Sequence, residues 1–178
     1  MTRLKQNAMV RPVSKGIKYM NKRKWTHILT KLLTLFLVGY CTYIALEVTY
    51  RNVSYPLMGC VGGISLLLFD QINNKISWNL DLILQGFIGS AIVTSFELFV
   101  GEALKVLNHP LMWDYSNMPF NYDGVICLPF SIVWIIITIL GILVADAYNY
   151  YLFHEEPRPY YWIIGHYFVM PKRYCDGE

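Results

Sequence analysis

Residues 125–145 form an uninterrupted run of 21 residues without a charged side chain, Val-Ile-Cys-Leu-Pro-Phe-Ser-Ile-Val-Trp-Ile-Ile-Ile-Thr-Ile-Leu-Gly-Ile-Leu-Val-Ala. A helix rises 1.5 Å per residue, so this run covers roughly 30 Å, the thickness of the hydrocarbon core of a bilayer. A helix in a small soluble domain keeps a polar stripe that faces water, and this run has none. It therefore predicts a helix whose solvent is lipid.

The charged residues of the chain are few and unevenly placed. They make up 15% of the 178 residues, well below the roughly 25% of soluble domains, so we expect one compact membrane domain. Residues 1–24 carry eight basic side chains and no acidic one, which favours a cytoplasmic N-terminus. A basic segment is also typical of nucleic-acid binding, but only membrane segments follow it here, so we expect no nucleic-acid partner.

The hydropathy pattern predicts an all-α membrane protein, a bundle of about four transmembrane helices. The expected helices run from about Ile28 to Glu47, Tyr55 to Phe69, Leu80 to Val106 and over residues 125–145. The second helix is the shortest, because 15 residues cover only about 22 Å; it is short, tilted into protein or partly re-entrant. We divide the chain into a basic segment (1–24), a transmembrane domain (25–150) and an interfacial tail (151–178).

Four crossings place both termini on one side of the membrane. Lys172, Arg173 and Arg158 of the tail then lie with the basic segment on the cytoplasmic side, as the positive-inside rule favours. The loop over residues 107–123 lies on the outer side. The sequence therefore predicts a multi-pass protein with both termini in the cytoplasm.

Two segments are expected to lie on the membrane surface. In the basic segment, apolar residues recur at spacings of 4, 4 and 3, at Met9, Val13, Ile17 and Met20. This pattern is typical of a basic amphipathic helix on anionic lipid, and a disordered basic arm is the alternative. In the tail, residues 160–170 are too short to span, and their tyrosines and tryptophan suit the headgroup zone.

Ionisable side chains inside a membrane are costly and need a partner or a purpose. Glu47 precedes Arg51 by four residues, an order that pairs well on a helix, and three tyrosines share its face, Tyr40, Tyr43 and Tyr50. We expect this face to point into the bundle or a wet cavity. The alternative is an ion pair that only caps the outer end of the helix.

Glu97 lies deeper in its predicted helix. It shares a stripe with the residues Ser90, Thr94, Gly101 and Lys105. Such a carboxylate pairs with a base, takes up a proton or lines a water path. The structural alternative is a hydrogen bond that only holds helices together. Near the end of the same helix, Glu102 and Lys105 are spaced for a local ion pair.

The sequence contains no enzyme signature: no GxSxG elbow, HExxH, Walker A loop or GxGxxG motif occurs. Its four cysteines are isolated, so no zinc site is implied. His154, Glu155 and Glu156 are the one set that suggests a metal, and a solvated patch at a helix end is the favoured interpretation. We expect neither a catalytic site, a metal nor a cofactor.

The loop before the charge-free run contains residues suited to a folded turn. Trp113 and Tyr115 suit the outer membrane interface, and Asp114 and Ser116 offer oxygens to a turn. Asp123-Gly124 predicts a further turn. We expect the loop to fold against the bundle, where it gates a path, docks a partner or simply seals the helices.

Residues 112–134 also resemble a family of small bacterial membrane proteins, the CmpB-like, or type IV, group of ABC-transporter permeases. The residues that carry the resemblance are Trp113, Asp114, Tyr115, Ser116, Pro119, Asn121, Gly124, Ile126, Cys127, Leu128 and Trp134. The helix with Glu97 looks like the family's third helix. Val125 departs from the pattern, which has a basic or polar residue there, so we expect no charge pairing of that position with Glu97.

The resemblance implies a transport subunit in the bacterial cytoplasmic membrane that works with an ATPase subunit, or on an ion gradient, and forms oligomers. A non-transport scaffold or regulator of envelope assembly is the alternative, and a membrane enzyme comes third. A water path to Glu97 would favour transport. A solid bundle with Glu97 fully paired would favour the scaffold.

Overall fold

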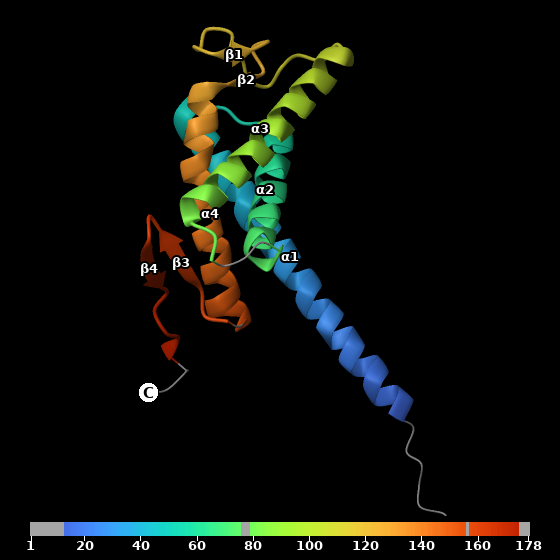
Figure 1. Cartoon of the computed structure of the whole chain (residues 1–178). Coiled ribbons are helices and arrows are strands. Elements are labelled where there is room, and N and C mark those ends of the chain that lie inside the picture. Colours follow the sequence, from blue (N-terminus) through green and yellow to red (C-terminus); the bar gives the residue numbers. More distant parts are fainter. Residues whose placement is uncertain (1–12, 76–78, 156, 175–178) are drawn as a thin grey trace, which may run out of the picture.

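The computed structural model describes residues 13–75, 79–155 and 157–174, and it confirms an all-α membrane architecture. Its helices are α1 (Val13–Arg51), α2 (Pro56–Lys75), α3 (Leu82–Val106) and α4 (Leu128–Phe153) (Figure 1). Two small antiparallel hairpins complete it: β1 (Asn121–Tyr122) with β2 (Ile126–Cys127), and β3 (Tyr160–Ile163) with β4 (His166–Val169).

Three stretches of the described helices are long and apolar enough to cross a membrane: Lys24–Arg51, Leu82–Val106 and Leu128–Phe153. The apolar part of α2, Pro56–Ile72, is shorter. The whole of α2 has 20 residues, about 30 Å, and continues past the expected end at Phe69. It continues across the carboxylate of Asp70 because that group is buried against a partner on α4, Asn149.

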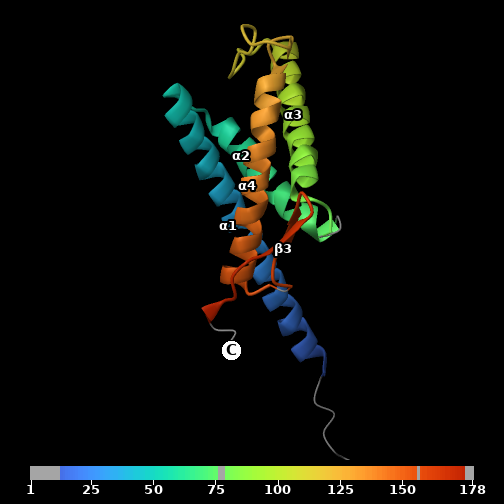
Figure 2. The ribbon, with the colours of Figure 1, turned by 60° about the vertical axis from the view of Figure 1, so that its left-hand side comes forward.

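α1 is much longer than the expected helix from Ile28 to Glu47. Its 39 residues extend about 58 Å, and its N-terminal part projects beyond the other helices (Figures 1 and 2). The predicted amphipathic stretch around Met9 starts in residues 1–12, which lie outside the described part of the chain. From Val13 on, the backbone is helical without a break into the first membrane segment.

The bundle consists of two helix pairs, α1 with α2 and α3 with α4, and α2 also contacts α3 and α4. Small residues bring the helices together. Gly59 and Gly63 of α2 lie against the rings of Tyr40 and Phe36 of α1. Gly89 of α3 lies against Thr138 of α4. The buried core runs through the centre of the bundle and includes Leu35, Leu66, Phe69, Val93, Trp134 and Ile142.

α4 begins at Leu128, three residues after the start of the charge-free run. Ile126 and Cys127 extend and pair with Asn121 and Tyr122 as a short hairpin. Pro129 then occupies the first turn, where its missing N–H costs nothing. The helix passes the expected end at residue 145 and reaches Phe153, because the polar groups that follow the run are buried against protein.

The interfacial tail forms the β3–β4 hairpin. Asp81, just before α3, fixes its position: one carboxylate oxygen caps α3 at Ile83 N, and the other accepts a hydrogen bond of 2.7 Å from Ile164 N. Tyr167 and Phe168 on β4 are half exposed. This hairpin and the last described residues lie at the end of the bundle where α1 projects, and β1–β2 lies at the opposite end (Figure 1).

Candidate functional site

Glu97 on α3 is almost completely buried, with 3% of its surface exposed. Trp134 Nε1 of α4 donates a hydrogen bond of 3.1 Å to one carboxylate oxygen. The hydroxyl of Tyr115, in the loop between α3 and α4, donates one of 3.2 Å to the other. Within the described ranges no ion pair includes Glu97. The carboxylate is therefore held by two neutral donors.

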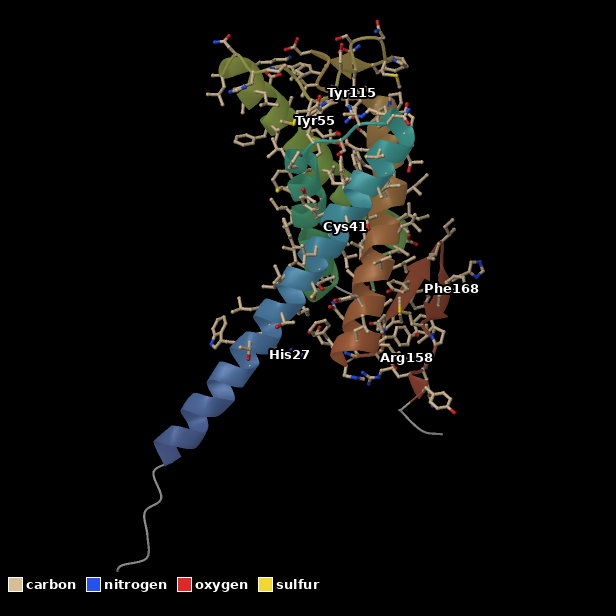
Figure 3. The ribbon with its side chains drawn as sticks, turned by 180° about the vertical axis from the view of Figure 1, so that it is seen from behind. His27, Cys41, Tyr55, Tyr115, Arg158 and Phe168 are labelled. Carbon is tan, nitrogen blue, oxygen red and sulfur yellow. The ribbon has the colours of Figure 1, made fainter. Side chains whose placement is uncertain are left out.

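Tyr115 is placed by the backbone and by a ring contact. Its N–H donates to Gly124 O at 2.8 Å, and its ring stacks on Phe130 of α4 with centroids 4.7 Å apart. Burial, and then the negative charge of Glu97, raises the pKa of the Tyr115 hydroxyl above its usual value. The hydroxyl stays protonated at neutral pH and remains a donor. Figure 3 shows Tyr115 at the end of the bundle opposite Arg158 and Phe168.

The polar residues of the predicted stripe around Glu97 bond to other parts of the protein. Ser90 Oγ donates to the Ser131 carbonyl at 2.6 Å, and Thr94 Oγ1 donates to Ser131 Oγ at 3.2 Å. Lys105, at the end of α3, pairs with Asp123 at 2.5 Å and with Glu102 at 3.4 Å. The predicted pair of Glu102 and Lys105 is confirmed, although Asp123 is the nearer partner.

Val125 explains why position 125 cannot pair with Glu97 in this chain. Its side chain is fully buried, and a Cβ placed on Gly101 would lie only 2.2 Å from Val125 Cγ1. Gly101, the small residue of the stripe, therefore packs against the apolar side chain of Val125. Glu97 obtains its partners from Tyr115 and Trp134 instead.

Glu47 and Arg51 form the predicted ion pair at the end of α1. The pair does more than cap the helix, because Arg51 Nη1 also donates to the Met112 carbonyl of the loop at 3.0 Å. Ser54 Oγ donates to Glu47 Oε2 at 2.5 Å. The pair therefore connects α1 to the chain that follows it and to the loop that carries Tyr115.

The tyrosine face of α1 turns inward only in part. Tyr40 lies on Gly59, and the ring of Tyr43 stacks on Trp134 with centroids 5.8 Å apart. Tyr43 thus links the α1 stripe to the indole that donates to Glu97. For Tyr50 the expectation was wrong: it is 73% exposed, and its ring meets Phe130 edge-on from the last turn of α1.

Trp113, which was expected at the outer membrane interface, is covered by protein in the structure. The indole is buried, it packs with Met58 and Val125, and its Nε1 donates to Val125 O at 2.7 Å. A tryptophan needs an acceptor for its N–H when it is buried, and the β1–β2 turn provides one. Trp113 is therefore the anchor by which the loop packs on the bundle.

Asp114, Ser116, Asn121 and Gly124 build the turn itself. Asp114 Oδ1 accepts hydrogen bonds from Ser116 N at 2.8 Å and from Ser116 Oγ at 2.5 Å, and these bonds lower the pKa of Asp114. Asn121 donates to the carbonyls of Ser116 and Met118 and accepts from Gly124 N. Gly124 has a φ of +67°, and a Cβ there would meet Ser116 Oγ at 2.6 Å, so the turn requires glycine.

A second polar cluster, at the other end of the bundle, was missed by the sequence reasoning. Asp70 of α2 is buried and accepts hydrogen bonds from Asn149 and, at 2.7 Å, from Gln71. Lys31 of α1 lies 3.8 Å from Asp70 and 3.0 Å from Glu155. The sequence contains a signal for this cluster. Lys31 is a charged residue inside the first predicted helix, and Asp70 directly follows the second predicted helix.

Glu155 of this cluster also belongs to the metal candidate at the end of α4, which comprises His154, Glu155 and Glu156. Glu155 pairs with Lys31, and the backbone N–H of Glu155 donates to Asn149 O. Within the part of the chain that the structure describes, no three His, Cys, Asp or Glu side chains gather as metal ligands. Glu156 lies outside that part.

Glu97, Tyr115 and Trp134 form a hydrogen-bonded contact between two helices and a loop, which we call the Glu97 latch. One buried carboxylate joins α3, α4 and the loop between them, and neither of its donors carries a charge. It can take up a proton, or release Tyr115, without separating an ion pair. Movement of the loop would have to break this contact, the Arg51 bond to Met112 and the contacts of Trp113.

Comparison with known proteins identifies the family. The family model described as "Putative ABC-transporter type IV" matches residues 38–171, which is more than half of the chain. Neither a curated protein nor a solved structure matches the chain. The matched region contains the Glu97 latch, the turn around Asp114 and the β3–β4 hairpin. The chain therefore belongs to the CmpB-like, type IV ABC-transporter family of membrane proteins.

Proposed function

We propose that this protein is the membrane-embedded permease subunit of an ABC-type transporter in the bacterial cytoplasmic membrane. The observation that carries the proposal is the extent of the family match. Residues 38–171 include the C-terminal part of α1, all of α2, α3 and α4, and the loop over the Glu97 latch. The part shared with the family thus covers α2, α3, α4 and the C-terminal part of α1.

The energy for transport would come from a second protein. The sequence contains no Walker A loop, so we propose that a separate ATPase subunit binds and hydrolyses ATP and that this chain itself catalyses no reaction. A bundle of four helices is small for a transport path. We therefore propose that the working unit contains at least two membrane subunits, either copies of this chain or a related partner.

In this proposal the Glu97 latch keeps the outer loop closed. The carboxylate is buried beneath the loop and holds Tyr115 by one hydrogen bond. A transport cycle that opens the outer side would break the hydrogen bond from Tyr115 to Glu97. The Glu97 carboxylate would then be hydrated by water or protonated. Such a step suits a buried ionisable group, which is costly inside a membrane unless it has a purpose.

The second candidate is a non-transport scaffold or regulator of envelope assembly. The observation that favours it is the complete pairing of Glu97, since both carboxylate oxygens accept a hydrogen bond. In that case the latch would only fix the loop as a docking surface. Glu97→Gln would then leave function unchanged, whereas the transport proposal expects it to impair function.

The test is purification of the tagged full-length protein from native membranes in mild detergent, followed by mass spectrometry. We expect an ATPase with a Walker A loop to co-purify in stoichiometric amount and to hydrolyse ATP in the complex. The control is the same purification with an unrelated tagged membrane protein. If envelope-assembly proteins co-purify and no ATPase does, the scaffold is the better assignment.

A further inference from the structure

The turn of the β3–β4 hairpin holds an isoleucine in a backbone conformation that isoleucine rarely adopts. Ile163 pairs with His166, so the two residues between them, Ile164 and Gly165, form the turn. Both have a positive φ, +49° at Ile164 and +76° at Gly165. Two-residue turns of this kind favour asparagine, aspartate or glycine, because a β-branched side chain is strained at positive φ. The strain at Ile164 therefore indicates a use for its apolar side chain.

The Ile164 side chain lies on the surface, 75% exposed, at the level where α3 begins. The N–H of Ile164 donates a hydrogen bond of 2.7 Å to Asp81, the N-cap residue of α3. Figures 1 and 2 show the hairpin beside the last turns of α4, with its turn next to the start of α3. α3 is long and apolar enough to cross the membrane, and Leu84 and Phe87 in its first two turns are half exposed. The turn therefore adjoins a lipid-facing surface.

The length of α3 places its ends at the edge of the hydrocarbon core. Its 25 residues extend about 37 Å, whereas the hydrocarbon core is about 30 Å thick. The first residues of α3, and the turn bonded to Asp81, therefore lie close to the boundary between acyl chains and headgroups.

The hairpin is basic at its base and uncharged at its turn. Residues 159–171 contain no Asp, Glu, Lys or Arg, whereas Arg158 precedes them and Lys172 and Arg173 follow them. Arg158 Nε donates to the Met170 carbonyl, which holds the two arms of the base together. Basic side chains suit anionic headgroups, and an apolar side chain suits the acyl chains, so this gradient fits a membrane leaflet.

The two faces of the hairpin differ. Tyr161 points to the bundle, where it is buried and bonded to Asp146 of α4. On the opposite face, the ring of Tyr167 lies 5.4 Å from that of Tyr160 and 5.2 Å from that of Trp162, between centroids. Tyr167 is 53% exposed and Trp162 is 36% exposed. Rings that combine an apolar body with a polar group favour the headgroup zone.

The backbone limits how deeply the hairpin can insert. Within the described residues its sheet has two strands, so one edge of β4 has no strand beside it. Backbone groups without partners are not tolerated among acyl chains, so the strands must stay in the headgroup zone and only the turn can reach deeper.

We propose that the β3–β4 hairpin is a membrane anchor that inserts turn first into the leaflet where α3 begins. Ile164 lies against the acyl chains, Trp162 and Tyr167 lie among the headgroups, and the basic base faces lipid phosphates. A lipid surface is favoured over a partner protein because the turn adjoins the lipid-facing start of α3. The aromatic residues alone indicated the headgroup zone, whereas the role of Ile164 follows from the fold. This anchor does not depend on transport activity.

The test measures the depth of residue 164 in the full-length protein, in nanodiscs of phosphatidylcholine and phosphatidylglycerol. The four native cysteines are replaced by alanine, and bimane is attached to a single new cysteine. Ile164→Cys is compared with Leu84→Cys, half exposed on α3, and with Tyr174→Cys, fully exposed beyond the base. We expect a nitroxide on the lipid acyl chain to quench positions 164 and 84, and iodide in the water to quench position 174.

Two results of the quenching experiment would overturn the anchor. One is quenching at position 164 that matches position 174. The other is iodide access to position 164 that ends only when a co-purified protein is bound, because the hairpin would then bind a protein partner.

Substitution of Ile164 in the otherwise native chain separates the turn from the anchor. Ile164→Asn fits the turn better but is polar, whereas Ile164→Leu stays apolar. In the same nanodiscs, amide hydrogen exchange of the hairpin should become about fivefold faster in the Asn variant, the value of roughly half of an isoleucine's transfer out of water. The Leu variant should match the wild type.

Unchanged or slower exchange in Ile164→Asn would show that Ile164 serves only the turn, and so would an equal rise in both variants. Exchange in α4 shows whether the bundle is intact. If the Asn variant disturbs α4 as well, the quenching at position 164 decides.

Discussion

Glu97 shows how a carboxylate is accommodated within a membrane-spanning helix without a counter-charge. Its two oxygens meet an indole N–H and a phenol O–H, and both donors come from residues with large apolar rings. The rings exclude lipid and water, while their polar atoms satisfy the carboxylate. Interhelical hydrogen bonds of this kind are worth about 0.6–2 kcal/mol each in membrane proteins.

Substitution of Glu97 separates hydrogen bonding from charge. In Glu97→Gln, the amide oxygen can accept from Trp134 while the amide nitrogen donates to Tyr115, whose hydroxyl also accepts. We expect the free energy of unfolding to change by less than about 0.5 kcal/mol. Glu97→Leu removes the acceptor of both donors and should cost about 1–3 kcal/mol.

The free energy of unfolding of both Glu97 variants can be measured in bicelles by tryptophan fluorescence. A Gln variant as unstable as the Leu variant would show that the negative charge, rather than the pair of hydrogen bonds, holds the loop. Under the transport proposal, the Gln variant should fold normally and lose activity.

Individual residues were predictable when their partners are near in sequence or on the same helix face. The Glu47–Arg51 and Glu102–Lys105 pairs follow from spacing along one helix. The partners of Glu97 do not, because they are brought together only when α3, α4 and the loop pack. The same holds for Asp70 with Asn149, and for the burial of Trp113.

At the scale of elements, the close approach of α3 to the loop depends on one glycine. A Cβ on Gly101 would overlap Val125 Cγ1, so Gly101→Ala should force the loop away and cost about 1–3 kcal/mol. Val125→Ala removes the colliding methyl groups. The double variant should therefore be more stable than the sum of the two single effects predicts.

A double-mutant cycle of unfolding free energies tests the contact between Gly101 and Val125. Strict additivity would mean that the helix and the loop adjust independently and that this contact does not position Tyr115.

The β3–β4 hairpin docks through a buried tyrosine, and this makes its attachment depend on pH. Tyr161 donates a hydrogen bond of 2.8 Å to Asp146 Oδ2. Burial, and then the charge of Asp146, raises the pKa of Tyr161 above its ordinary value of 10.0. The folded state favours the protonated phenol, so its stabilising effect is complete below pH 10 and declines as the pH rises above 10.

We expect the unfolding free energy to fall more between pH 8 and pH 11 in the wild type than in Tyr161→Phe. Tyr115 titrates in both proteins, so the difference between them isolates Tyr161. Equal pH dependence in the two proteins would show that the hairpin docks through its other contacts.

The elements themselves were predicted to different degrees. The apolar runs located all four helices, because in lipid the backbone must satisfy its own hydrogen bonds. The observed ends differ from the predicted ends where partners distant in sequence stabilise the helix. α2 and α4 extend past Asp70 and Asp146, whose carboxylates are buried. The tail was predicted at the membrane interface without a secondary structure. Its hairpin forms by pairing within the tail, and the hairpin docks through contacts with Asp81, far away in sequence, and with Asp146 of α4.

At the scale of the whole molecule, the two polar clusters lie at opposite ends of the bundle. The Glu97 latch holds the loop that leads to the β1–β2 hairpin, and the Lys31–Asp70–Glu155 cluster lies where α4 ends, before the β3–β4 hairpin. One end of the bundle is thus held by hydrogen bonds to a loop and the other by charge pairs.

The last prediction concerns topology. Reporter fusions at residues 24, 115 and 178 should place the first and last on the cytoplasmic side and the second outside. The basic segment and the tail residues Lys172 and Arg173 favour this orientation, and the structure puts the β3–β4 hairpin and the projecting part of α1 at one end of the bundle. The outcome depends on α2, whose apolar part is the shortest. A C-terminal reporter on the outer side would mean that α2 does not cross and that Asp70 lies in a re-entrant segment.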